Sequence, residues 1–550
     1  MRCLLGKLFS LGLLFSSTVV PGAAEPVEPW LEWHYVGAKA LKEHPDAITV
    51  REIFRLPESK RLSEILIAKL ARTPEKHVFG PQSLTPPARL RLLKLLLADM
   101  LQFESTGALA GPLDETMTLS LGIKLPGPKV DEWDRMFRRY LGMLGWPAPD
   151  QDSETEGVSW TTRYEGKPQQ AQMLQHGDWL FISIGSQTVD QVTTWTTETT
   201  DKAGLKLIEG NALRLKGDLS PLVQWLSSVS LPDLPSFEAH FKPGKESVRT
   251  EASIQLKQAI EMPLPEWQIP TNVVREPLAS FSGSRALRPL IASLPGTQKL
   301  AEIGLPNQLY SWSRPALITT NSIPLYPAYL GWPISREEID ISNITKHLPT
   351  LIGKSMLQSG SARLLAVPER NETIVQVIPT FVQPFVSGFT NNTHGVRVAG
   401  LFPLSTMARP APDGLFSQLN SRENIVYYQW EITQDRISSY KTLLQFVSFI
   451  FQKTQSNAKD ATFRWLTALE PKMGNAVTLV TANEPTHLEL IRKSQIGFTG
   501  LELTLLARWL ESESFPWIDS ENLSEWTMRS FAPPPTAPAP TPTQNASARR

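Results

Sequence analysis

Apolar residues recur at helical spacing between residues 85 and 147. Thr85-Pro86-Pro87 predicts the start of one helix, from Ala88 to about Glu104, because proline suits a first helical turn. A second helix is predicted by apolar residues at i, i+3, i+4, i+7 and i+8, preceded by acids that favour a helix start. Its apolar face is Trp133, Met136, Phe137, Tyr140, Leu141 and Leu144, its acids are Asp131, Glu132 and Asp134, and Gly145 and Pro147 end it.

Alternating and short apolar runs, typical of strands, begin near Val158. The first set of expected strands is Val158–Glu165, Gln169–His176, Asp178–Ile184, 213–217, 237–241 and 247–260. A similar order recurs at 362–367, 373–377, 396–401, 424–433, 476–481 and 487–491. Residues 424–433 alternate most clearly, and Thr499-Gly500-Leu501-Glu502 forms a capping box that opens a last helix.

These patterns predict an α+β fold, with a helical N-terminal region followed by two similar antiparallel-sheet-plus-helix units. Val158–Ile260 and Ala362–Leu510 read as an internal repeat of one unit, and the Pro-rich stretch between them reads as an irregular connection. The expected division is a signal peptide at 1–24, a helical region at 25–150, units at 151–262 and 356–528, a connecting region at 263–355 and a disordered Pro-rich tail at 529–550.

The first 24 residues are typical of a secretory signal. Arg2 and Lys7 give a positive start, residues 8–20 carry no charge, and small residues precede an expected cleavage between Ala24 and Glu25. An uncleaved anchor is the alternative. The only cysteine, Cys3, precedes the apolar stretch, so the processed chain holds no disulfide and no thiolate ligand. We therefore expect a bacterial protein that is periplasmic or secreted.

Composition excludes several classes of protein. Hydrophobic residues make up 41% of the 550 residues and charged residues 20%, enough for sizeable cores. After removal of residues 1–24 the chain has 52 bases against 54 acids, and it shows no strongly basic domain of the kind that binds nucleic acid. No later segment reaches 18 uninterrupted apolar residues, so we expect no transmembrane segment after signal cleavage.

Two blocks carry a resemblance to a known family. They are Asn424-Ile425-Val426-Tyr427-Tyr428-Gln429-Trp430-Glu431-Ile432-Thr433 and Arg492-Lys493-Ser494-Gln495-Ile496-Gly497-Phe498-Thr499-Gly500-Leu501-Glu502-Leu503. With the weaker blocks 277–281 and 306–312, they make the stretch from about Leu207 to Trp517 resemble an uncharacterised family of large exported bacterial proteins. The resemblance implies export and an α+β build, and it implies no catalytic residue.

Candidate chemistry is sparse. Ser-x-x-Lys occurs at Ser438/Lys441 and Ser456/Lys459, but the companion motifs of serine acyl-transferases are missing. Glu431 ends an aromatic strand and is either a general acid or a paired structural carboxylate. The eight histidines have no metal-ligand spacing, and the candidate sugar-stacking tryptophans fit core packing better. These tryptophans are Trp160, Trp179, Trp195, Trp430 and Trp465.

Basic residues at Arg89, Arg91 and Lys94 give the helix from Ala88 an exposed edge, which we interpret as the solvated side of a core helix; a membrane-surface helix is the alternative.

We assign no catalytic, cofactor-binding or metal-binding residue. We expect a non-enzymatic binding or scaffolding protein whose partner is a macromolecule of the cell envelope and not nucleic acid. The alternatives are an envelope hydrolase with an assembled carboxylate or serine site, and a chaperone-like carrier of lipid or protein, which needs an apolar groove between sheet and helices.

Overall fold

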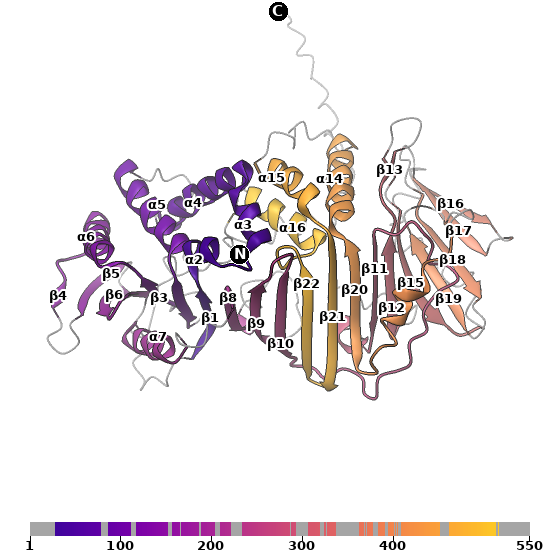
Figure 1. Ribbon diagram of the computed structural model, residues 1–550, viewed down its shortest axis with the longest axis horizontal. Helices are drawn as coiled ribbons and strands as arrows, with labels where there is room; N and C mark the ends of the chain where they lie inside the picture. Colours follow the sequence, from indigo (N-terminus) through magenta and orange to yellow (C-terminus); the bar gives the residue numbers. More distant parts are fainter. Residues whose placement is uncertain are drawn as a thin grey trace, which may run out of the picture.

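The computed structural model describes twenty strands joined in one sheet, with helices packed on it (Figure 1). The described residues are 28–78, 86–111, 117–151, 157–164, 167–185, 189–203, 210–221, 234–286, 288–292, 306–318, 324–325, 327–336, 362–367, 369, 371–377, 383–390, 394–400, 402, 404, 409–450, 461–512 and 515. The predicted signal, its Ala24–Glu25 cleavage site and the Pro-rich tail at 529–550 lie outside them.

The strands are short, as the many prolines and turn residues of the sequence predict. They are β1 Pro29–Tyr35, β2 Ser105–Ala110, β3 Thr118–Lys124, β4 Asp150–Gln151, β5 Val158–Tyr164, β6 Lys167–His176, β7 Trp179–Gly185, β8 Leu213–Asp218, β9 Ser236–Pro243, β10 Val248–Gln255, β11 Ser280–Arg285, β12 Gln308–Ser313, β13 Leu317–Ile318, β14 Pro324–Leu325, β15 Ala328–Ile334, β16 Ala362–Val367, β17 Glu372–Val377, β18 Phe385–Thr390, β19 Gly395–Gly400, β20 Ile425–Ile432, β21 Asn475–Glu484 and β22 His487–Ser494. β13 and β14 form a separate hairpin.

The strand pairing of the large sheet is linear and antiparallel throughout. From one edge to the other the order is β4-β5-β6-β7-β3-β2-β1-β8-β9-β10-β22-β21-β20-β11-β12-β15-β19-β18-β17-β16. The ten strands β1 to β10 and the ten strands β11 to β22, without β13 and β14, are arranged alike. In each set, strands that hold the same place in the chain hold the same place in the sheet, counted from the outer edge inward. The equivalent strands β10 and β22 pair with each other in the middle, from Val248↔Ser494 to Gln255↔His487. We call the two sets of ten strands the first and second half of the sheet.

The predicted fold, a helical N-terminal region followed by two similar antiparallel-sheet-plus-helix units, is wrong. β1, β2 and β3 lie within the region 25–150 that was expected to be helical. β1 pairs with β8, β3 pairs with β7 and β2 lies between β1 and β3, so these strands belong to the same sheet as those of 151–262. β10 pairs with β22, which joins this sheet to the strands of 356–528. Residues 263–355, expected to be irregular, contribute β11, β12 and β15 to the same sheet.

Eleven α-helices and one 3₁₀-helix occur among the described residues. They are α2 Gly37–Glu43, α3 Ile48–Arg55, α4 Pro57–Val78, α5 Pro87–Gln102, α6 Gly127–Met143, α7 Val189–Ala203, α9 Arg288–Ala292, α13 Asp413–Ser417, α14 Thr433–Ile450, α15 Ala461–Leu469, α16 Gly500–Glu511 and the 3₁₀-helix η4 Glu470–Lys472. No helix in this described part of the chain is long and apolar enough to cross a membrane.

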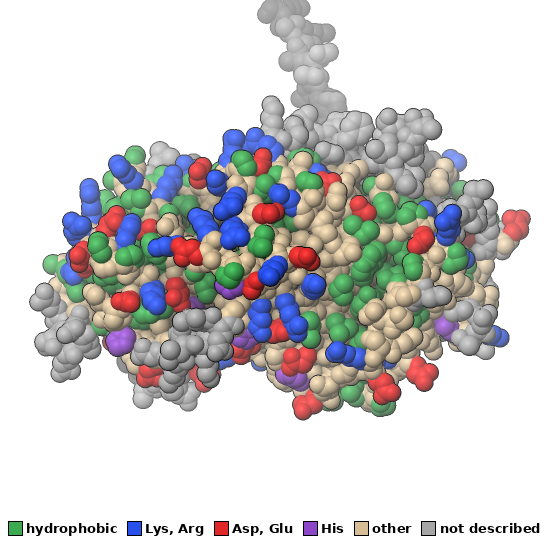
Figure 2. All heavy atoms as spheres, viewed as in Figure 1, with side chains coloured by type: hydrophobic (Ala, Val, Ile, Leu, Met, Phe, Trp, Pro, Cys, Tyr) green, Lys and Arg blue, Asp and Glu red, His purple; other side chains and the backbone are tan. Residues whose placement is uncertain are grey.

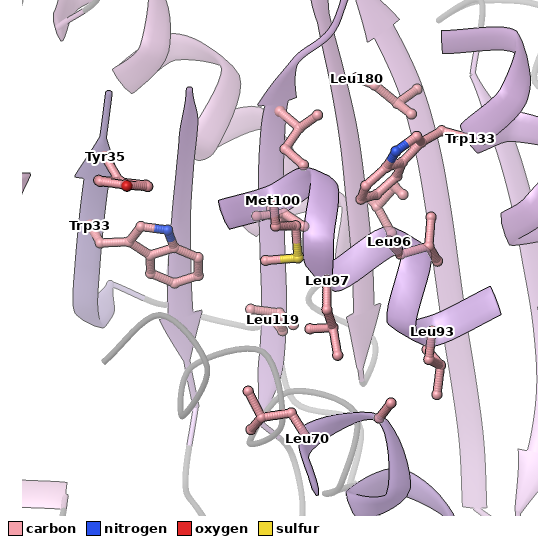
Figure 3. Close-up of a cluster of buried hydrophobic side chains, with 14 of the residues drawn as sticks. Trp33, Tyr35, Leu70, Leu93, Leu96, Leu97, Met100, Leu119, Trp133 and Leu180 are labelled. Carbon is pink, nitrogen blue, oxygen red and sulfur yellow. The ribbon is translucent and has the colours of Figure 1, made fainter. Parts of the chain in front are cut away.

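The main apolar core lies between α4, α5 and α6 and one face of the first half of the sheet (Figure 3). Trp33 and Tyr35 project from β1 while Leu96 and Leu97 descend from α5 onto the same layer. The opposite face is covered by α7, where Val192 packs on the small residues Ala108 and Ala110 of β2. Strands β2 and β3 are therefore buried on both faces, so small and polar side chains such as Ala108 and Ser120 are buried together with the larger apolar ones.

Candidate functional site

An apolar cavity of about 110 Å³ lies where helices from both ends of the chain meet over the central strands. Two of its walls come from helices of the first half, α3 and α4. Val50, Ile53 and Phe54 face it from α3, at i, i+3 and i+4. The facing positions of α4 follow the same helical spacing, and they are Ser59, Leu62, Ser63 and Leu66.

The other side of the cavity comes from the C-terminal helices. Trp465 of α15 and Leu503, Leu506 and Leu510 of α16 face α3 and α4. The position of α16 is fixed at its start by the predicted capping box, because the Thr499 hydroxyl accepts from the backbone of Glu502 and the Glu502 carboxylate accepts from the backbone of Thr499. Phe241, Pro243 and Val248 of the sheet and the nearby Leu41, Ala212, Ile496 and Phe498 complete the lining.

Few polar contacts cross from α4 to the C-terminal helices. The indole Nε1 of Trp465 donates to the hydroxyl of Ser59 at 3.0 Å. The Lys69 ammonium donates to the carbonyl of Leu510 at 2.6 Å. Lys69 also donates to the carbonyl of Ser512 at 3.4 Å. Beside these contacts, Ile53 of α3 belongs to the same apolar cluster as Leu466 and Leu503.

The lining contains no ionisable side chain, since Ser59 and Ser63 are its only polar members among eighteen residues. Such a lining offers water few hydrogen-bond partners; an enclosed cavity of ~150 Å³ lined by aliphatic and aromatic side chains stays dry and takes up benzene. The cavity is therefore suited to an apolar group, and it offers nothing that could hold a metal ion or an anionic cofactor.

Glu431, the candidate general acid, lies elsewhere, beneath the first turn of α16, and its side chain is 0% exposed. Its Oε1 accepts from the backbone N–H of Gly500 at 2.7 Å and from the Thr433 hydroxyl at 2.9 Å. Its Oε2 accepts from the Gln429 amide at 3.2 Å and lies 4.0 Å from Nε of Arg436. Both oxygens are engaged by the protein itself, which is the arrangement of the structural alternative.

The Ser438/Lys441 pair does not form a nucleophile and base. The Lys441 ammonium donates to the carboxylate of Glu470, and it lies over the ring of Phe463 at 5.5 Å. Ser456 and Lys459 lie outside the described residues.

The histidines are dispersed over the sheet. His34 bonds to Glu104 at 2.8 Å, His240 lies 3.2 Å from Glu238 and His487 bonds to a neighbouring glutamate. Within the ranges that the structure describes, no three histidines or acids gather into a group that could hold a metal ion. The acids Asp131, Glu132 and Asp134 lie one turn inside α6, because this helix begins at Gly127.

The five candidate tryptophans have different surroundings. Trp160 is buried in the main core, and Trp430 and Trp195 are half-buried against other clusters. Trp179 stacks on Phe181. Only Trp465 lines the cavity, so sequence reasoning selected one residue of the site and missed the rest. The missing signal was the matching helical spacing of α3, α4 and α16, whose inward residues read as ordinary core.

No known protein family matches this chain, and no curated protein matches it. Among solved structures, TP0453 in its crystal form I is similar over 46% of this chain and 82% of its own length, with 12% sequence identity and a TM-score of 0.23. A TM-score this low carries no argument about fold or function.

Proposed function

We propose that this is an exported, non-enzymatic binding protein whose ligand inserts an apolar group, such as the end of an acyl chain, into the cavity between α4 and α16. The cavity carries this proposal: its lining is apolar, it lies between sheet and helices, and it contains no group that could perform chemistry. Export is supported by the signal-like residues 1–24. The partnered states of Glu431 and Lys441 favour binding over hydrolysis.

The size of the cavity sets the expected affinity contribution. About 110 Å³ accommodates three or four methylene groups. Each buried methylene contributes ~0.8 kcal/mol, so filling the space stabilises a complex by roughly 2–3 kcal/mol, a factor of about 30 to 150 in affinity. A longer chain requires α4 to separate from α15 and α16, which breaks the hydrogen bonds of Lys69 and Ser59 across this contact and separates the apolar side chains that pack there.

A fluorescent acyl chain, cis-parinaric acid, tests the proposal. Ser63→Phe places a ring in the cavity and should weaken binding of the probe by about 30-fold or more. Ala40→Phe makes a similar enlargement on the exposed side of α2 and should bind like the unaltered chain. Leu66→Ala enlarges the cavity and should bind the probe more tightly, although it costs the free protein about 2–5 kcal/mol.

The outcome that would overturn the proposal is absence of probe binding by the unaltered chain. Equal binding by Ser63→Phe and Ala40→Phe, with unchanged circular dichroism, would also overturn it, because the probe would then be bound outside the cavity.

A further inference from the structure

The outward sides of α4 and α5 carry a group of basic residues that the cavity does not use. Lys60, Arg61 and Arg72 lie on the exposed side of α4. Arg91 is exposed and Lys94 half-buried on α5, which packs beside α4. We call these five side chains the basic face. Figure 2 shows blue Lys and Arg spheres gathered over this part of the molecule.

The charges of the basic face are not neutralised by the protein. None of its five residues forms an ion pair with any acid in the described ranges. The bases of the next helix differ, since Lys129 pairs with Asp99 at 3.1 Å and Arg138 with Asp134 at 2.8 Å. The acids of α4 are Glu58, Glu64 and Glu75; of the two whose side chains the structure describes, Glu64 is exposed and Glu58 is half-buried.

Exposed apolar surface lies beside the basic face. Leu95 follows Lys94 on the outward side of α5 and is 43% exposed, and the exposed Ala98 lies one turn further along. Bases that surround an exposed leucine suit a bilayer, because the cations meet anionic headgroups while the leucine enters the interface. A nucleic acid would use the cations alone.

From these observations we infer that the basic face of α4 and α5 docks on the surface of an anionic lipid bilayer. The same helix then serves two surfaces, since the inward side of α4 lines the cavity and its outward side meets the membrane. The docking goes beyond the proposed function and does not require that the cavity bind a ligand.

The test compares three forms of the full chain in co-sedimentation with vesicles of phosphatidylcholine alone or with 30% phosphatidylglycerol. The basic-face variant changes Lys60, Arg61, Arg72, Arg91 and Lys94 to Gln. The control changes five other exposed bases, none of them in an ion pair, and loses the same net charge. These are Arg163, Lys245, Arg363, Arg422 and Lys493, each changed to Gln.

We expect the unaltered chain and the control to partition onto vesicles that contain phosphatidylglycerol. The basic-face variant should lose about a thousandfold or more in partition coefficient, since each of its five bases near an anionic surface contributes a factor of about five. High salt should remove the preference. Equal losses in the two variants, or no preference of the unaltered chain for anionic vesicles, would overturn the inference.

Two further measurements separate this inference from the others. Binding of a DNA duplex that is as tight as vesicle binding and equally sensitive to the basic-face changes would mean that any polyanion suffices, and would refute membrane docking. The Ser63→Phe chain should retain vesicle binding. If the Ser63→Phe chain binds vesicles but no longer binds cis-parinaric acid, both proposals stand. If no form of the protein binds vesicles while the unaltered chain still binds cis-parinaric acid, the docking inference fails and the proposed function remains.

Discussion

Replacement of Glu431 tests whether its carboxylate serves structure or catalysis. In the folded protein this side chain accepts from the Gly500 N–H at the start of α16, from Thr433 and from Gln429. Glu431→Leu leaves these donors without their acceptor. It also removes the carboxylate that lies 4.0 Å from Nε of Arg436, although Arg436 keeps its hydrogen bonds to Ser313 and Tyr440. Each unsatisfied buried donor costs about 1–3 kcal/mol, and loss of one partner of a buried ion pair costs about 3–5 kcal/mol. Gln429 is half-buried and Arg436 keeps two other hydrogen bonds, so mainly the donors of Gly500 and Thr433 lose their partner, and we expect a total of about 3–5 kcal/mol.

Glu431→Gln retains one carbonyl oxygen for Gly500 and Thr433 and loses the charge opposite Arg436, so it should cost about 1–3 kcal/mol. Urea denaturation followed by tryptophan fluorescence gives the midpoints, and hydrogen exchange should increase first at the amides that begin α16. Glu484→Gln, at an exposed position of β21, is the matched control and should leave the midpoint unchanged. A loss below about 1 kcal/mol for Glu431→Leu would refute the reasoning, because the carboxylate would then not be a structural acceptor.

Two further predictions concern stability. Gly107→Ala places a Cβ against the ring of the buried Trp33 and should cost about 1–3 kcal/mol or more by thermal denaturation. Gly142→Ala, on the open side of α6, should instead stabilise by roughly 0.5–1 kcal/mol, and equal effects would contradict the packing argument. Burial raises the pKa of Glu32 above its usual 4.5 despite the nearby Lys216. A carboxyl whose pKa is raised in the folded state stabilises the protein at low pH, and this stability is lost as the pH rises through the raised pKa. Glu32→Gln should therefore leave the free energy of unfolding unchanged at pH 4 and increase it by under ~1 kcal/mol at pH 8. The opposite trend in melting temperature would refute this reasoning.

The sequence predicted local elements where one face of the chain is polar. The strand expected at 424–433 is β20, Ile425–Ile432, and the hairpin near Ala482 is formed by β21 and β22. The capping box at Thr499 is confirmed, because its two reciprocal hydrogen bonds depend only on residues close in sequence.

The arrangement of these elements could not be predicted in the same way. β2 and β3 are buried on both faces; β2 shows no regular polar alternation, and the alternation of Thr118-Leu119-Ser120-Leu121 in β3 does not reveal that both of its faces are covered. The pairing of β10 with β22 joins Val248 to Ser494, and no local pattern specifies a partner so distant in sequence. The cavity was missed for a related reason, since it exists only where α3 and α4 meet α15 and α16.

The exported location and the resemblance to an exported family remain predictions. The basic edge at Arg89, Arg91 and Lys94 was interpreted from sequence as the solvated side of a core helix. Arg91 is exposed and Arg89 and Lys94 are half-buried, on a helix whose other side is buried core. What the sequence did not reveal is that bases of α4 lie beside it and that, among the residues the structure describes, none of these bases forms an ion pair with an acid.

The antiparallel pairing of β10 with β22 has a consequence for fragments of the chain that are expressed separately. Either set of ten strands, expressed alone, would end in an open edge whose backbone N–H and C=O groups are arranged to receive a strand running the opposite way. A second copy of the same fragment supplies such a strand, and a twofold axis through the seam would reproduce the intact geometry. The complete polypeptide is thus organised like a symmetric dimer whose subunits have been tethered end to end.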